Sequence, residues 1–172
     1  MFKKLFKTLT QSDEDRFREQ IDGAAAKLEV GGSPRLARTL REFGKLKQGL
    51  DSRLKEGDSS LLKIDDLGKH AESVCEAAIA QLSELAELEN TLPGVLTSRD
   101  ADRFATYLQK WEVGNQSLMR GYAALDRAIS GNGPTLIEES GVDGEKSALD
   151  VAAESLLVEV RTAERIRNEL GR

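Results

Sequence analysis

The chain has 172 residues and a net charge of −5, and 32% of its residues are charged. This length suits one domain, and the abundance of Ala, Leu, Glu, Lys and Arg with only three prolines favours helices over a sheet. The negative charge argues against nucleic acid as the main partner, because affinity for nucleic acid comes mostly from neutralising phosphates.

The compartment is predicted from cysteine usage and apolar runs. Cys75 is the only cysteine, so no intrachain disulfide is possible. No apolar run approaches the roughly 20 residues that cross a bilayer, and the basic start lacks the apolar region of a signal peptide. We expect a soluble, cytoplasmic protein, with the inner face of a membrane as an alternative location.

The first ten residues form a basic amphipathic segment. Apolar and basic side chains alternate in it at helical spacing: Phe2, Leu5, Phe6 and Leu9, with Lys3, Lys4 and Lys7 between them. Such a segment can contact an anionic membrane weakly, dock on the bundle or a second subunit, or stay disordered. Ser12 is the predicted cap of a separate helix that ends at Gly31-Gly32.

Two long helices are predicted next. Ser33-Pro34 begins a helix over residues 34–56, since serine caps helices and proline suits the first turn. The following helix, over residues 59–90, has an apolar arc wide enough to contact two or more neighbouring helices. Pro93-Gly94 then makes a turn.

The helix over residues 98–130 carries the clearest pattern in the chain. Positions spaced alternately by three and four residues form a heptad seam of the kind found in bundles and coiled coils. Its members are Ala101, Phe104, Leu108, Trp111, Asn115, Leu118, Tyr122, Leu125 and Ile129. We expect this seam to face inward along its whole length, with Trp111 as the largest core anchor. Asn115, its single polar position, is predicted to fix register or oligomeric state, and the alternatives are a polar ligand contact inside the bundle or simple exposure.

A glycine-rich connection precedes the last helix, over residues 145–170. Four helices of similar length predict an all-α, elongated up-down-up-down bundle with an N-terminal helical arm. The predicted organisation is the segment 1–10 followed by one domain over 11–172. An elongated dimer that shares helices is the alternative architecture.

Charge is unevenly distributed between two neighbouring helices. Residues 34–56 hold seven basic and three acidic side chains, whereas residues 59–90 are acidic. The simpler interpretation is that these helices pair by charge. The alternative is a basic face, formed by Arg35, Arg38 and Lys45, that binds phosphates or an acidic partner.

No motif predicts a catalytic, cofactor or metal site. His70 and Cys75 lie on different faces of one helix, and Asp66 with His70 gives too few ligands for a metal. We therefore expect a non-enzymatic interaction or scaffold protein that binds a protein partner or itself, with weak anionic membrane contact as an extension. The alternatives are a small-ligand or carboxylate-based enzymatic bundle, and nucleic-acid binding through the basic 35–55 helix.

Overall fold

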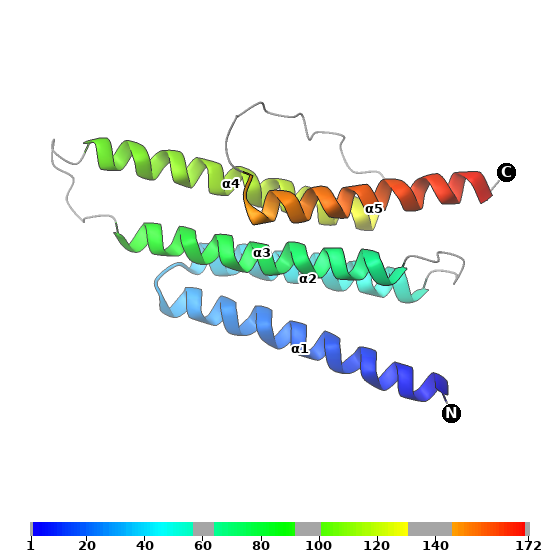
Figure 1. Cartoon of the computed structure of the whole chain (residues 1–172). Coiled ribbons are helices and arrows are strands. Elements are labelled where there is room, and N and C mark those ends of the chain that lie inside the picture. The colour runs from blue at the N-terminus through cyan, green and yellow to red at the C-terminus, as the bar shows by residue number, and fades with distance from the viewer. Residues whose placement is uncertain (1, 57–63, 92–100, 131–145, 171–172) are drawn as a thin grey trace.

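The computed structural model describes residues 2–56, 64–91, 101–130 and 146–170, and these residues form five helices without a strand (Figure 1). The helices are α1 (Phe2–Val30), α2 (Pro34–Glu56), α3 (Ile64–Thr91), α4 (Ala101–Ser130) and α5 (Ala148–Leu170). The prediction of an all-α, elongated bundle with an N-terminal helical arm is confirmed.

The turn between α1 and α2 forms as its residues predict. Gly32 has a φ of 88°, which only glycine adopts without strain. The amide of Ser33 donates to the carbonyl of Leu28 at 2.9 Å, and the amide of Gly32 donates to that of Glu29 at 3.1 Å. These two bonds satisfy carbonyls at the end of α1, so the chain reverses tightly into Pro34.

Two predicted helix boundaries are wrong. Ser12 does not begin a second helix, because α1 continues through it from Phe2 to Val30. The last helix begins at Ala148 rather than near residue 145, because Ser147 caps it. The predicted starts of α3 and α4, at residues 59–63 and 98–100, lie outside the described residues.

The direction of the last helix also differs from the prediction. Helices α1 to α4 alternate in direction, but α5 runs parallel to α4 (Figure 1). Two side-chain contacts agree with the parallel direction. Ser117 bonds to Asp150, and further toward the C-terminus of both helices Arg127 pairs with Glu164. The topology is therefore up-down-up-up for α2 to α5. A long connection between α4 and α5 permits the return.

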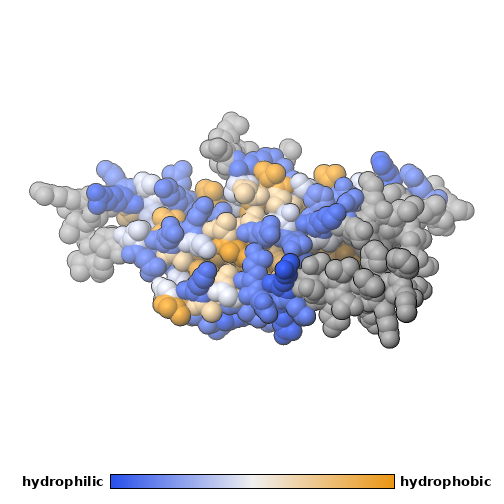
Figure 2. All heavy atoms as spheres, turned by 60° about the horizontal axis from the view of Figure 1, so that its bottom comes forward, coloured by the Kyte–Doolittle hydropathy of each residue, from blue (hydrophilic) through white to orange (hydrophobic). Residues whose placement is uncertain are grey.

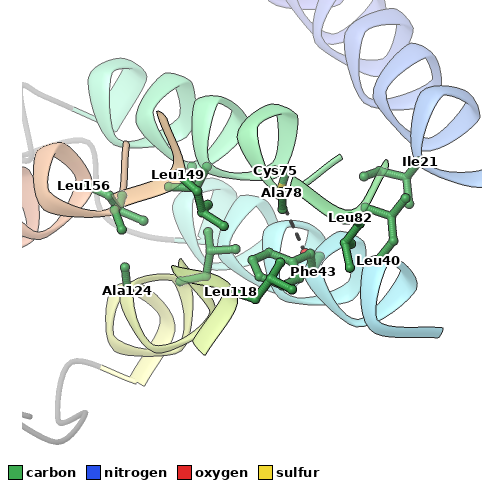
Figure 3. Close-up of a cluster of buried hydrophobic side chains, with 14 of the residues drawn as sticks. Ile21, Leu40, Phe43, Cys75, Ala78, Leu82, Leu118, Ala124, Leu149 and Leu156 are labelled. Atoms are coloured by element: carbon green, nitrogen blue, oxygen red, sulfur yellow. Dashed lines mark hydrogen bonds between the residues drawn. The ribbon is translucent and has the colours of Figure 1, made fainter. Parts of the chain in front are cut away.

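Helix α3 is central, because it contacts each of the other four helices. The backbone of α2 lies close to α1, α3 and α4, whereas among the described residues it does not approach the backbone of α5. The wide apolar arc of α3 follows from this position. Figure 3 shows side chains from all five helices pointing into one core, among them Phe43 from α2, Leu82 from α3 and Leu149 from α5.

A buried ion pair interrupts the core between α1 and α2. Lys47 is 7% exposed, and its ammonium donates to Asp51 at 2.7 Å while lying 4.9 Å from the ring centre of Phe17. Burial raises the pKa of Asp51, and the hydrogen bond from Lys47 offsets this only in part. Lys47 therefore occupies an apolar position of α2 because two neighbours compensate its charge.

None of the helices in the described ranges is long and apolar enough to cross a bilayer. Figure 2 shows the face that carries α1, where the surface is mainly hydrophilic and hydrophobic residues form separate patches.

Candidate interaction surface

One face of α4 carries large apolar side chains in contact with solvent. Leu108, Met119 and Tyr122 are 47%, 65% and 41% exposed, and Phe104 and Asn115 on the same face are half-buried. These five residues, here called the α4 stripe, are spaced at multiples of three and four and so lie along one side of the helix. The stripe is therefore a continuous, partly solvent-exposed apolar line with one amide in it.

The prediction that the heptad seam faces inward along its whole length is wrong. Leu118 and Leu125 are buried, whereas Leu108 and Tyr122 are exposed, and Phe104, Trp111 and Asn115 are only half-buried. Trp111 is not the main core anchor either, since it is only half-buried and the largest fully buried side chain in the described ranges is Phe43.

The physical reason is that α4 packs through its small residues. The buried positions of α4 are Gly114, Ser117, Leu118, Gly121, Ala124 and Leu125. A Cβ atom on Gly114 would lie 2.8 Å from Leu85, and one on Gly121 would lie 2.8 Å from Leu149. Close approach at these two glycines turns the small side of the helix inward, and Leu108, Asn115 and Tyr122 therefore lie toward solvent.

Three aromatic rings stack along the first half of α4. The ring centres of Phe104 and Tyr107 lie 6.2 Å apart, as do those of Tyr107 and Trp111. Partial burial and the nearby carboxylate of Glu89 raise the pKa of Tyr107. This half of α4 extends beyond the first turn of α2 and the first turn of α5, so these two helices leave it uncovered (Figure 1).

Tyr122 connects the α4 stripe to α2. Its ring lies edge-on to Phe43, with the centres 5.9 Å apart and the planes at 84°. The next helical turns keep the same neighbours, since a Cβ atom on Gly49 of α2 would lie 3.6 Å from Cδ1 of Ile129 in α4. Helices α2 and α4 therefore run parallel and in fixed register beside the stripe.

The predicted basic face lies on α2, and all three of its residues are exposed. Lys45 is engaged by Glu42 at 2.7 Å, whereas Arg35 and Arg38 form no ion pair with a described residue. Arg35 lies in the first turn of α2, which contains no acidic residue, and a cation at that end is unfavourable for the helix dipole. Arg35 is therefore placed at a cost to α2 and is free to meet an external acid.

The predicted membrane or partner contacts Phe2, Lys3, Lys4, Leu5, Phe6, Lys7 and Leu9 belong to α1, but their side chains lie outside the part of the chain described at that level. The structure shows where these residues lie along α1. Glu14 pairs with Lys55 near the end of α2, so the first turns of α1 lie at that end of the bundle. Figure 1 shows this end of α1 leading away from the bundle.

A buried polar cluster joins α4 to α5, and the sequence analysis did not identify it. Asp150 is 7% exposed and accepts hydrogen bonds from Ser117 at 2.8 Å, Ser147 at 2.8 Å and Arg120 at 3.0 Å. Burial opposes the charge of Asp150, but these hydrogen bonds outweigh it and lower the pKa of the carboxyl. Ser147 and Asp150 also bond to each other's backbone amides, at 3.1 and 3.2 Å.

This reciprocal bonding is a capping box, a motif that the spacing Ser147-x-x-Asp150 predicts from the sequence. Ser117 and Arg120 add two contacts from α4 that no local pattern predicts. All four polar groups are used to start α5 and to fix it against α4. The cluster therefore has a structural role.

The residues considered for chemistry are not brought together. Cys75 is fully buried, its thiol donates to the carbonyl of Phe43 at 3.8 Å, and burial raises its pKa to about 12 (Figure 3). His70 remains half-exposed and Asp66 exposed, with no hydrogen bond between them. Within the described ranges, no three His, Cys, Asp or Glu side chains gather as metal ligands would.

A shallow groove of about 230 Å³ lies between α1 and α2. Its lining residues are Phe17, Arg18, Ile21, Asp22, Arg41, Gly44, Lys45 and Gln48. Two of its cations are already paired, Arg41 with Glu29 at 2.6 Å and Lys45 with Glu42 at 2.7 Å. The groove therefore offers little uncompensated charge to a ligand.

No protein-family model matches the chain, and neither a curated protein nor a solved structure matches it significantly. The functional proposal therefore depends on the residues described above.

Proposed function

We propose that this protein is a non-enzymatic interaction protein that binds another helix through the α4 stripe. The observation that carries the proposal is the exposure of Leu108, Met119 and Tyr122 on one helical face. Apolar residues at heptad spacing have little use on a helix that faces only water, whereas they are what a helix–helix interface requires.

The aromatic composition supports the same proposal. Interface centres are enriched in methionine and in aromatic residues, and aromatic side chains bury a large area at low cost in conformational entropy. Phe104, Trp111, Met119 and Tyr122 all lie on or beside the α4 stripe, although aromatics make up only 5% of the chain. The most buried charged side chains in the described ranges, Asp150 and Lys47, are engaged in structural bonds, which favours a binding role over a catalytic one.

A photo-crosslinking amino acid at position 119 tests this function. The matched control carries the same group at Ala26, an exposed position of α1. We expect discrete crosslinked species from position 119, in purified protein or in cells, that disappear when Leu108→Glu is added. Equal crosslinking from both positions, or products that survive Leu108→Glu, would refute the proposal.

A second candidate is peripheral membrane contact through residues 1–10, and the position of α1 favours it. A helix that begins at Phe2 and diverges from α2 toward this end presents its first turns away from the bundle (Figure 1). A basic amphipathic helix in this position suits the interface of an anionic bilayer.

Co-sedimentation with vesicles that contain phosphatidylserine tests the membrane contact. We expect weak binding that weakens further with salt and is lost on deletion of residues 2–9. Leu108→Glu serves as the control and should leave vesicle binding unchanged. Binding that persists without residues 2–9 would contradict this candidate.

The remaining alternatives have less support. Nucleic-acid binding would use Arg35, Arg38 and Lys45, but Lys45 is already paired with Glu42. A carboxylate-based or small-ligand bundle needs a polar pocket between helices, whereas the core shown in Figure 3 is filled by apolar side chains.

A further inference from the structure

We infer that the partner of the α4 stripe is a second copy of this chain, whose α4 lies parallel and in register against the first. This inference depends on the proposed function and adds to it the identity, direction and register of the partner. Three observations carry it: the half-buried amide of Asn115, the charges on either side of the stripe, and the fixed register of α2 beside α4.

Asn115 lies in the middle of the stripe, between Leu108 and Tyr122. Its side-chain amide makes no hydrogen bond with another described residue, so both its donor and its acceptor are available. A primary amide is self-complementary, because each group can donate to and accept from an identical one. In a parallel pair of helices, an Asn at an a position meets its own copy and fixes both register and the number of strands.

The charges beside the stripe select the direction. On one side of Leu108 lies Tyr122, which contacts α2, and on the other side lies Glu112, which is exposed and forms no ion pair with a described residue. In a parallel pair, the twofold axis runs along the helices. It therefore turns the Glu112 side of one copy toward the α2 of the other.

The register of α2 then places a basic residue opposite Glu112. Phe43 is level with Tyr122 and Gly49 with Ile129, so the same offset places Arg35 level with Gly114, two residues from Glu112. Arg35 lies two heptads before Gly49 and hence near the edge of α2 that borders α4. Arg35 of one copy and Glu112 of the other therefore pair, twice by symmetry. An antiparallel pair would place both α2 helices on one side and both Glu112 residues on the other.

The size of the surface limits the affinity. From Phe104 to Tyr122 the helix rises about 27 Å and is about 10 Å wide. This footprint is small beside the roughly 800 Å² that each partner buries in a stable complex. We therefore expect a reversible dimer that forms with rising concentration, and not an obligate one.

Analytical ultracentrifugation of the full chain over a range of concentrations tests the inference. We expect a monomer–dimer equilibrium for the unaltered protein and a monomer for Leu108→Glu. The matched control is Val158→Glu, which changes an exposed valine of α5 and should dimerise like the unaltered protein. Circular dichroism confirms that both variants fold.

Charge reversal tests the register. Each exposed ion pair changes a dissociation constant by up to about fivefold, so loss of two pairs should raise the dimer Kd roughly tenfold. We expect this from Arg35→Glu and from Glu112→Arg, and near-normal affinity when both changes are combined. Failure of the combined variant to recover overturns the parallel register, and a protein that stays monomeric at all concentrations overturns the self-pairing.

The two proposals can fail separately. A monomeric protein whose position 119 still crosslinks to other proteins, in a manner sensitive to Leu108→Glu, refutes self-pairing and leaves the proposed function standing. Absence of any such crosslink refutes both.

Discussion

The orientation of α4 can be tested by adding one methyl group to Gly121. A Cβ atom there would lie 2.8 Å from Cδ1 of Leu149 and 3.3 Å from both Cγ of Leu149 and Cε1 of Phe43. Both neighbours are fully buried, so neither side chain can move into open space. The substitution Gly121→Ala therefore overpacks the junction of α2, α4 and α5.

The magnitude follows from two opposing terms. Alanine in place of glycine inside a helix stabilises by about 1 kcal/mol, whereas overpacking a dense core costs about 1–3 kcal/mol. Gly121→Ala should therefore destabilise by about 0–2 kcal/mol. Gly23 lies in α1 with no atom within 4 Å of its added Cβ, so Gly23→Ala should stabilise by about 0.5–1 kcal/mol.

Urea unfolding followed by circular dichroism measures both variants. The expected result is a higher midpoint for Gly23→Ala, an unchanged or lower one for Gly121→Ala, and relief of any Gly121→Ala penalty in a Leu149→Ala background, where the 2.8 Å contact is removed. If both alanine variants stabilise the protein equally, α4 is not packed through its small residues. The outward position of Leu108 and Tyr122 would then lose its physical basis.

Three further predictions concern the buried polar groups. Because burial raises the pKa of Cys75 to about 12, its thiol should not react with a thiol reagent at neutral pH in the folded protein and should react fully in urea, and rapid native labelling would contradict this. The pKa of Asp150 is lowered in the folded state, so its charge stabilises the fold above the ordinary carboxyl range and this contribution is lost as the pH falls through the lowered pKa. Asp150→Asn should therefore lower Tm at neutral pH and flatten the acid side of the Tm–pH curve, whereas an unchanged curve would count against the cluster. Lys47→Met should destabilise the protein because it leaves the Asp51 carboxylate buried without its partner, and Lys47→Met with Asp51→Leu should recover most of the loss in urea unfolding.

Local signals in the sequence predict the helices well. Gly31-Gly32 and Ser33-Pro34 carry a specific backbone requirement at adjacent positions, and the structure places the turn between α1 and α2 there. The predicted boundary at Ser12 is wrong because a residue that can cap a helix does not always begin one. When the flanking segments both favour helix, a serine can remain inside one.

The orientation of α4 could not be predicted, for a reason particular to its sequence. Apolar periodicity counts Leu108 and Tyr122 but gives no weight to Gly114, Ser117 or Gly121, whose value lies in permitting close approach. Two stripes therefore compete for the core, and contacts with Leu85 and Leu149, distant in sequence, decide between them. The heptad pattern nevertheless identified Phe104, Leu108, Asn115 and Tyr122, four of the five residues of the α4 stripe, and missed Met119.

The direction of α5 and the burial of Asp150 also depend on contacts between residues that are distant in sequence. Ser147-x-x-Asp150 predicts a helix start, but Ser117 and Arg120 meet it only because α5 runs parallel to α4. A long connection after Ser130 leaves that direction open, so tertiary contacts determine it.

Hydroxyl-radical oxidation of Met119, measured by mass spectrometry from low-micromolar to near-millimolar protein, tests the central claim most directly. At low concentration this side chain, 65% exposed, should oxidise readily, and it should become protected as the concentration rises. Val30, the last residue of α1, is 91% exposed and should be labelled equally throughout. Protection of Met119 at every concentration would mean that the α4 stripe faces the core, and labelling that never decreases would mean that no second copy covers it.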